Sequence, residues 1–246
     1  MVGGRSWGTG KYIETMLGEL IDGAAAAVPG QCEICRAWPA RMVCDGCALQ
    51  FAQPRARCRR CALAVPQGVA ECGHCLRTPP PLDTCHAAVS YGYPWSGLIT
   101  RYKFHGQPGW AQAFALLMRS APWVEPALEQ AELVLPMPLA PARLAERGFN
   151  QALELARRLA PGRTDAGLLL RVRETVPQVA LEREARLANV SGAFALEPLR
   201  AAAVRGRRLL LVDDVMTSGA SLYAAATALR SAGAQSVGAV VFARTD

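Results

Sequence analysis

Two adjacent acids, Asp213 and Asp214, stand between an apolar run and a small polar loop. The run is residues 209–212, LLLV, and the loop is residues 217–221, TSGAS. Carboxylates in this position can accept hydrogen bonds from the vicinal diol of a sugar or hold Mg²⁺. The unpaired N–H groups at the start of a following helix would bind a phosphate. The segment therefore predicts a phosphosugar site. The loop residues that would contribute to it are Thr217, Ser218, Gly219, Ala220 and Ser221.

The paired acids also fit a simpler interpretation, in which they form an Asp-rich turn that caps a helix. The segment is not a Walker loop, because the pattern GxxxxGK[ST] is missing. The acids alone fit both interpretations equally well. A strand, two acids, a polar loop and a helix in succession favour the phosphosugar site.

Four CxxC pairs hold eight of the nine cysteines, and the ninth is Cys85. Two residues between cysteines let both sulfur atoms face one ion, and two such pairs make the four-thiolate set that zinc prefers. We expect two structural zinc ions, each bound by neighbouring pairs rather than by interleaved ones. A disulfide framework and an iron–sulfur cluster are the alternatives, and His74 is expected to be an exposed spacer. The pairs are Cys32 with Cys35, Cys44 with Cys47, Cys58 with Cys61, and Cys72 with Cys75.

The positive charge of this cysteine-rich segment has a local explanation. Residues 32–78 contain seven arginines and three acids, a formal surplus of four charges. Each four-thiolate zinc site carries two negative charges, so two sites cancel that surplus. The net charge of +7 for the whole chain is compatible with phosphate-rich ligands or nucleic acid but does not select between them.

The composition is that of an ordinary globular protein, with 51% hydrophobic and 19% charged residues. An uninterrupted apolar stretch of about 18 residues, the length of a membrane span, is missing. The N-terminal segment contains acids and is too irregular for a secretory signal, so we expect a cytoplasmic protein. Residues 1–27 are expected to be a weak amphipathic helix or a tail.

A domain boundary is predicted at residues 78–83, TPPPLD, where three prolines disfavour a continuing helix. The segment before it, residues 28–80, would be a double zinc ribbon, and residues 84–246 would be the main domain. The main domain alternates strand-like and helix-like patterns, which argues for a mostly parallel α/β sheet covered by helices. Strands are expected at residues 87–93, 132–137, 168–172, 209–212 and 236–243. A helix or turn is expected at residues 95–104, and helices are expected at residues 109–120, 150–159 and 219–231.

The run LLLVDDVMTSGAS resembles the signature of type I phosphoribosyltransferases that binds phosphoribosyl pyrophosphate (PRPP). The chain as a whole resembles the ComF family, which combines N-terminal CxxC pairs with a phosphoribosyltransferase-like domain. The resemblance extends over about residues 28–244. Three further segments carry it: RYKFHG at residues 101–106, PMPLAPARLAERGFNQ at residues 136–151 and RETVPQVALEREARLANVSGAF at residues 173–194.

This resemblance implies roles for particular residues. Asp213 and Asp214 would bind the ribose hydroxyls of Mg-PRPP, and residues 217–221 would bind its 5′-phosphate. Pyrophosphate would meet the backbone of Pro138, Leu139 and Ala140, together with Arg143 and Arg147. The two arginines also fit an exposed helix face, and residues 173–192 fit either a loop that covers PRPP or an ordinary excursion of the chain. Lys103 fits a surface position equally well, and Asn150 and Gln151 fit a helix start equally well. The residues that would support the site are Lys103, His105, Asn150, Gln151, Arg173, Gln178, Arg186 and Asn189.

The implied reaction is displacement of pyrophosphate from the anomeric carbon of Mg-PRPP by a nitrogen nucleophile, with Asp213 and Asp214 as the catalytic acids. The hypoxanthine and guanine enzymes carry an acidic base where Thr217 stands here, so that purine route is disfavoured. The second function class is a non-catalytic adaptor that binds nucleotide or DNA. Family members are linked to natural transformation, which would make single-stranded DNA or DNA-uptake proteins the partners.

Overall fold

The computed structural model describes residues 30–104, 107–173 and 192–246. These residues form two compact units, which divide between Cys47 and Ala48. The sheet and the second half of the cysteine-rich segment lie in the second unit, whereas the first four cysteines lie in the first. The boundary predicted at residues 78–83 stays a prediction, and the expected N-terminal helix falls outside the described residues.

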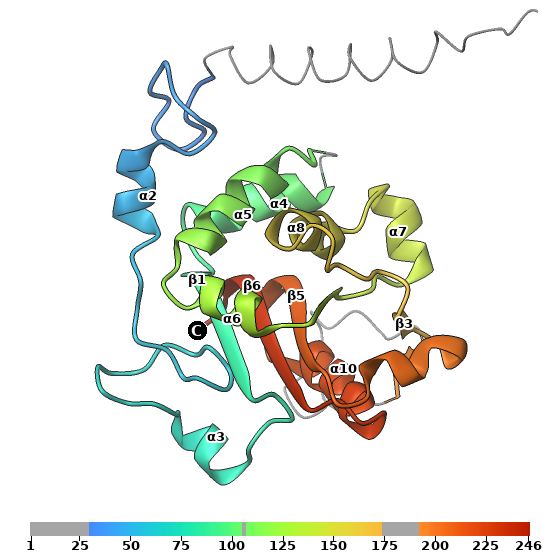
Figure 1. Ribbon diagram of the computed structural model, residues 1–246. Helices are drawn as coiled ribbons and strands as arrows, with labels where there is room; N and C mark the ends of the chain where they lie inside the picture. The colour runs from blue at the N-terminus through green and yellow to red at the C-terminus, as the bar shows by residue number, and fades with distance from the viewer. Residues whose placement is uncertain (1–29, 105–106, 174–191) are drawn as a thin grey trace, which may run out of the picture. The chain divides into compact units, whose positions relative to one another are not determined.

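The second unit is built on a four-stranded parallel sheet with the order β1-β6-β5-β2 (Figure 1). The mostly parallel α/β sheet expected from the sequence is confirmed. Strand β1 begins earlier than predicted, because its pairing with β6 already starts at Thr84. The strands are β1 (Thr84–Ser90), β2 (Leu133–Pro136), β5 (Arg208–Met216) and β6 (Ser236–Arg244). A separate antiparallel pair is formed by β3 (Leu169–Arg171) and β4 (Phe194–Leu196).

Helices precede, connect and cover these strands. Among the expected helices, the one at residues 95–104 has the predicted bounds, and the others differ by one residue at their start. The helices are α2 (Asp45–Phe51), α3 (Gly73–Arg77), α4 (Trp95–Phe104), α5 (Trp110–Ser120), α6 (Val124–Gln130), α7 (Pro141–Arg147), α8 (Gln151–Leu159), the short 3-10 helix η2 (Pro198–Val204) and α10 (Ala220–Ser231).

Alternation along β5 and β6 gives the sheet two apolar faces. Leu209 and Leu211 belong to one buried cluster with the apolar side of α10. On the other face Phe242 packs on Phe114, with ring centroids 4.0 Å apart, and meets Trp95 edge-on at 5.6 Å. Successive residues of a strand point to opposite faces, so this run of apolar residues is buried on both sides.

Strand β5 continues beyond its predicted end. The sequence suggested a strand that stops at residue 212, because two carboxylates follow it. Instead the strand runs through both acids to Met216, with Asp213 opposite Val241 of β6. The backbone hydrogen bonds of a parallel ladder do not depend on side-chain charge, so the neighbouring strand keeps the acids in extended conformation.

Candidate functional site

The extended backbone of β5 directs its two acids to opposite faces of the sheet. Asp213 lines a pocket beside the loop that follows the strand. Asp214 is buried, and its Oδ2 lies 2.9 Å from the Nζ of Lys103 on α4. The backbone N–H of Asp214 donates to Oδ1 of Asp213 at 2.8 Å. The acids therefore occupy distinct environments: Asp213 lines the pocket and is half-buried, and Asp214 is buried beside an ammonium group.

The pKa of Asp213 is changed by burial and by repulsion from Asp214. Burial first, and the neighbouring Asp214 carboxylate second, raise the pKa of Asp213 to about 8, although Lys103 opposes the shift. The folded protein therefore keeps a proton on this carboxyl at pH values where an unfolded chain has lost it.

This shift predicts that stability falls as pH rises. Between the unfolded pKa near 4 and the folded pKa, the folded state binds more protons, so the free energy of unfolding decreases with pH. The limit for one group is about 1.4 kcal/mol per pH unit. Asp213→Asn keeps an oxygen that can accept from the Asp214 N–H but removes the ionisable group. The free energy of unfolding of this variant, relative to that of wild type, should therefore rise from pH 5 to pH 8. Urea unfolding at four pH values measures this, and parallel curves would contradict it.

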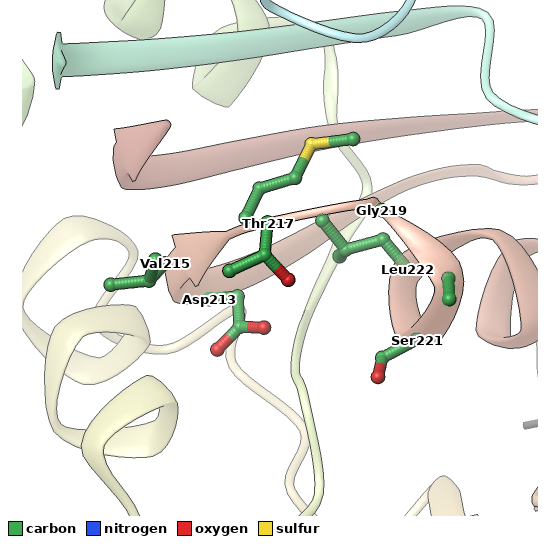
Figure 2. A pocket seen from close by; sticks show the side chains of 8 residues that line it. Asp213, Val215, Thr217, Gly219, Ser221 and Leu222 are labelled. Carbon is green, nitrogen blue, oxygen red and sulfur yellow. The ribbon is translucent and has the colours of Figure 1, made fainter. Parts of the chain in front are cut away.

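A tight turn connects β5 to α10. It is formed by the residues predicted to bind phosphate, 217–221, which are called the phosphate loop below. Gly219 has φ +83°, and a Cβ there would stand 2.4 Å from Cε of Met216 and 2.7 Å from the Tyr223 ring. Any other residue is strained on this backbone, and the two neighbouring side chains would have to shift to admit it. Figure 2 shows oxygen atoms of Asp213, Thr217 and Ser221 around one space beside the loop.

Ser218 supports the turn from within. Its Oγ accepts from the Ala220 N–H at 3.4 Å, at the first residue of α10. A serine hydroxyl that satisfies an N–H at a helix start is a common local arrangement, so this contact stabilises the junction of the phosphate loop and the helix.

A second wall of the site comes from the end of β2 and the helices after it. Parallel pairing places Pro136 opposite Val212, and the Met137 N–H donates to the Val212 carbonyl at 2.9 Å. Residues 138–140 therefore leave the sheet next to Asp213. Asn150 caps α8 by accepting from the Ala152 N–H at 2.9 Å, and its amide donates to the Met137 carbonyl at 3.1 Å.

Arg147 is held on this wall, near enough to Asp214 and Asp213 for their charges to act on it. Its guanidinium lies 4.9 Å from the centroid of the Phe104 ring and donates to Gln151 Oε1 at 3.0 Å. Burial lowers the pKa of Arg147, whereas the carboxylates of Asp214 and Asp213 oppose that shift. The Phe104 contact could not be foreseen from the sequence, since the two residues are far apart in the chain.

Three buried polar atoms around this wall lack a hydrogen-bond partner among the described residues. They are Nε of Arg147, Nε2 of Gln151 and Oδ2 of Asp214. The Asp214 atom forms an ion pair with Lys103 but has no hydrogen bond of suitable angle. Buried groups of this kind are normally satisfied, so their presence at one place indicates a site that a polar ligand completes.

Some of the remaining predicted site residues lie beside the pocket, and others are exposed or fall outside the described residues. Pro138, Leu139 and Ala140 form the loop beside Asp213, whereas Arg143 and Arg173 are exposed. His105, Gln178, Arg186 and Asn189 lie outside the described residues. Two residues missed by the sequence analysis, Met216 and Tyr223, pack against the phosphate loop.

The eight paired cysteines form two groups in the predicted sequential arrangement. The first cysteine group is Cys32, Cys35, Cys44 and Cys47, and the second cysteine group is Cys58, Cys61, Cys72 and Cys75. All nine cysteines are free of disulfide bonds.

The sulfur positions fit zinc. A tetrahedron with Zn–S bonds of about 2.3 Å has edges of about 3.8 Å. The Sγ atoms of Cys32 and Cys47 are 3.8 Å apart, and those of Cys61 and Cys72 are 3.7 Å apart. Either cysteine group could hold one zinc ion.

The comparisons with known proteins agree with this geometry. A family model described as the phosphoribosyl transferase domain matches residues 144–246. The DNA utilization protein YhgH of Escherichia coli O6:H1 is 31% identical over 233 residues, which are 89% of this chain and 98% of that protein. Competence protein F of Haemophilus influenzae is 32% identical over 170 residues, 66% of this chain and 73% of that protein.

The parallel sheet and the phosphate loop after β5 define a protein of the phosphoribosyltransferase class. With two cysteine groups ahead of that domain and relatives of this identity and coverage, the chain belongs to the ComF family. Within the described residues, we find no helix with the length and apolar character of a membrane span.

Proposed function

We propose that this protein binds Mg-PRPP through Asp213 and the phosphate loop, and that Asp214 supports the site through its ion pair with Lys103. One observation carries the proposal: a carboxylate and a glycine-dependent loop at the start of α10 line the same pocket. The loop would receive the 5′-phosphate at the helix N-terminus, and Asp213 would accept hydrogen bonds from the ribose hydroxyls. One carboxylate and one phosphate-binding turn, placed on either side of a pocket, match the two ends of a ribose 5-phosphate.

Pyrophosphate would lie along the second wall. Arg147 lies near the acid pair and has an unsatisfied Nε, and Gln151 has an unsatisfied Nε2. The loop at residues 138–140 would add backbone N–H groups. Mg²⁺ would neutralise part of the charge of the diphosphate. Lys103 forms an ion pair with Asp214, and its ammonium group would add a further positive charge near the diphosphate.

The reaction that this arrangement would support is displacement of pyrophosphate by a nitrogen nucleophile. Arg147 and the backbone of residues 138–140 would stabilise the charge on the leaving group, and Asp213 would fix the ribose. The carbon–oxygen bond to pyrophosphate breaks, and a carbon–nitrogen bond forms at the anomeric carbon. Thr217 occupies the place of an acidic base, so the acceptor is expected to be already deprotonated or to lose its proton to solvent.

A role in the use or uptake of DNA is the second candidate. The names of the relatives, DNA utilization protein and competence protein, support it, and the net charge of +7 is compatible with it. In this case the phosphosugar site would bind a nucleotide without turnover. Binding of a single-stranded oligonucleotide that weakens steeply between low and high salt would favour it.

Calorimetry with Mg-PRPP tests the main proposal. At a pH above the pKa of Asp213, where both acids are ionised, the wild-type protein should bind, and Asp213→Asn/Asp214→Asn should bind at least about tenfold more weakly, because charge-assisted hydrogen bonds contribute about 1.5–3 kcal/mol each. Asp165→Asn is the matched control, since Asp165 forms an ion pair with Arg200 away from the pocket. No heat from the folded wild type would refute the proposal.

A further inference from the structure

The phosphate loop is supported from behind by two side chains. The Met216 and Tyr223 side chains pack so closely on Gly219 that both would have to shift to admit a Cβ there. The same two side chains reach the surroundings of the second cysteine group. Met216 lies in one buried cluster with all four of its cysteines, and Tyr223 packs against that cluster. Met216 Sδ is 3.5 Å from the Sγ of Cys85 in the same cluster.

A buried arginine makes the connection through the backbone. Arg244, the last residue of β6, is only 6% exposed. Its Nε donates to the Cys61 carbonyl at 2.9 Å, and its Nη1 lies 3.4 Å from the Met216 carbonyl. The Met216 carbonyl also accepts from the Thr245 N–H at 3.1 Å. One guanidinium thus joins the carbonyl of a predicted zinc ligand to the carbonyl of the residue that precedes the phosphate loop.

The charge of Arg244 indicates what this arrangement requires. A buried guanidinium is costly unless it is compensated. Among the described residues the hydrogen bonds of Arg244 go to backbone carbonyls and to Thr245, whereas Arg59 and Arg60 form ion pairs with Glu71. Four thiolates with one zinc ion carry two negative charges. Zinc in the second cysteine group would therefore supply the compensating charge beside Arg244.

We propose that the second cysteine group positions the phosphate loop, with Arg244 as the positioning residue between them. The first cysteine group has no part in this. The inference rests on the proposed function of the loop as a phosphate site, and it adds that occupancy of one particular zinc site controls how well the loop is formed. Loss of zinc from that site would loosen residues 217–221 and weaken binding of the 5′-phosphate.

The test compares Arg244→Lys with Arg163→Lys. Lysine keeps the charge but cannot reproduce the two-pronged donor geometry of arginine. Arg163 is a matched control because its guanidinium also donates to two backbone carbonyls, those of Leu128 and Ala131, each at 2.8 Å. Two readouts are used: hydrogen exchange of the peptide around residues 216–222, and calorimetry with Mg-PRPP.

We expect the loop amide hydrogens to exchange at least tenfold faster in Arg244→Lys than in Arg163→Lys. We also expect Arg244→Lys to bind Mg-PRPP at least fivefold more weakly than Arg163→Lys. Both variants should keep two zinc ions. Equal exchange and equal affinity in the two variants would overturn the proposal. If wild type does not bind Mg-PRPP, the proposed function fails, yet the exchange measurement still tests the positioning.

A second measurement covers the case in which Arg244→Lys does not fold. In Cys35→Ser/Cys44→Ser the first cysteine group is disabled, so the remaining zinc reports on the second group. Chelator should then increase exchange of the loop amides in step with zinc release. In Cys58→Ser/Cys72→Ser, where only the first group can bind, chelator should leave those amides unchanged. If zinc release from Cys35→Ser/Cys44→Ser leaves the exchange rate of the loop amides unchanged, the proposal is overturned.

Discussion

Replacement of Cys75 by serine is expected to release one zinc ion and to lower the free energy of unfolding by at least about 3 kcal/mol. The free energy of zinc binding is largely free energy of folding in such sites, because the unfolded chain has no formed site. Cys75 is 1% exposed and lies in the buried cluster that also contains Met216 and Leu222. Loss of the metal would leave thiols in that cluster, beside the buried guanidinium of Arg244.

Zinc analysis and thermal unfolding measure this result. A change of 3 kcal/mol corresponds to a fall in Tm of about 6–12 °C for a domain of this size. Cys35→Ser is the matched variant, because Cys35 belongs to the first cysteine group, is exposed and lies in the other compact unit. It should also lose one zinc ion, but the main unfolding transition should shift by less than about 2 °C. Equal shifts in the two variants would contradict the expectation.

Gly219→Ala is expected to destabilise the protein by about 1–3 kcal/mol and to abolish binding of Mg-PRPP. Two costs add: a left-handed φ of +83° disfavours any side chain, and the new Cβ would stand 2.4 Å from Met216 Cε. The loop cannot move away without displacing the first turn of α10, whose Tyr223 N–H donates to the Gly219 carbonyl at 2.8 Å. The N–H groups proposed to bind phosphate would then change direction.

Gly162→Ala separates the two costs. Gly162 has φ +80° but no atom within 4 Å of its Cβ position, so only the backbone cost applies, about 1 kcal/mol. Urea unfolding of both variants gives the difference, which reports the clash at position 219. If the two variants lose the same stability, or if Gly219→Ala binds Mg-PRPP like wild type, Met216 and Tyr223 do not constrain the loop.

Much of the fold was predictable because the patterns involved are local. The run LLLV and the run SVGAVVFA are long enough in apolar residues to indicate buried strands, and an apolar stripe marks α10. The CxxC spacing likewise places two thiolates on one ion within a few residues. Local patterns failed where pairing with a neighbour decided the outcome, as in the continuation of β5 through its acids and in the three-residue strand β4.

The site divides in the same way. By itself the sequence located the two acids, the small polar loop after them and the four CxxC pairs, and it favoured a sequential grouping of those pairs, because each of these depends on residues close together in the chain. Only the tertiary structure decided that Lys103 would pair with Asp214, that Arg147 would stack on Phe104, and that Arg244 would join Cys61 to Met216. These contacts connect residues separated by tens to more than a hundred positions. They depend on how helices and loops pack around the sheet, which spacing along the chain does not encode.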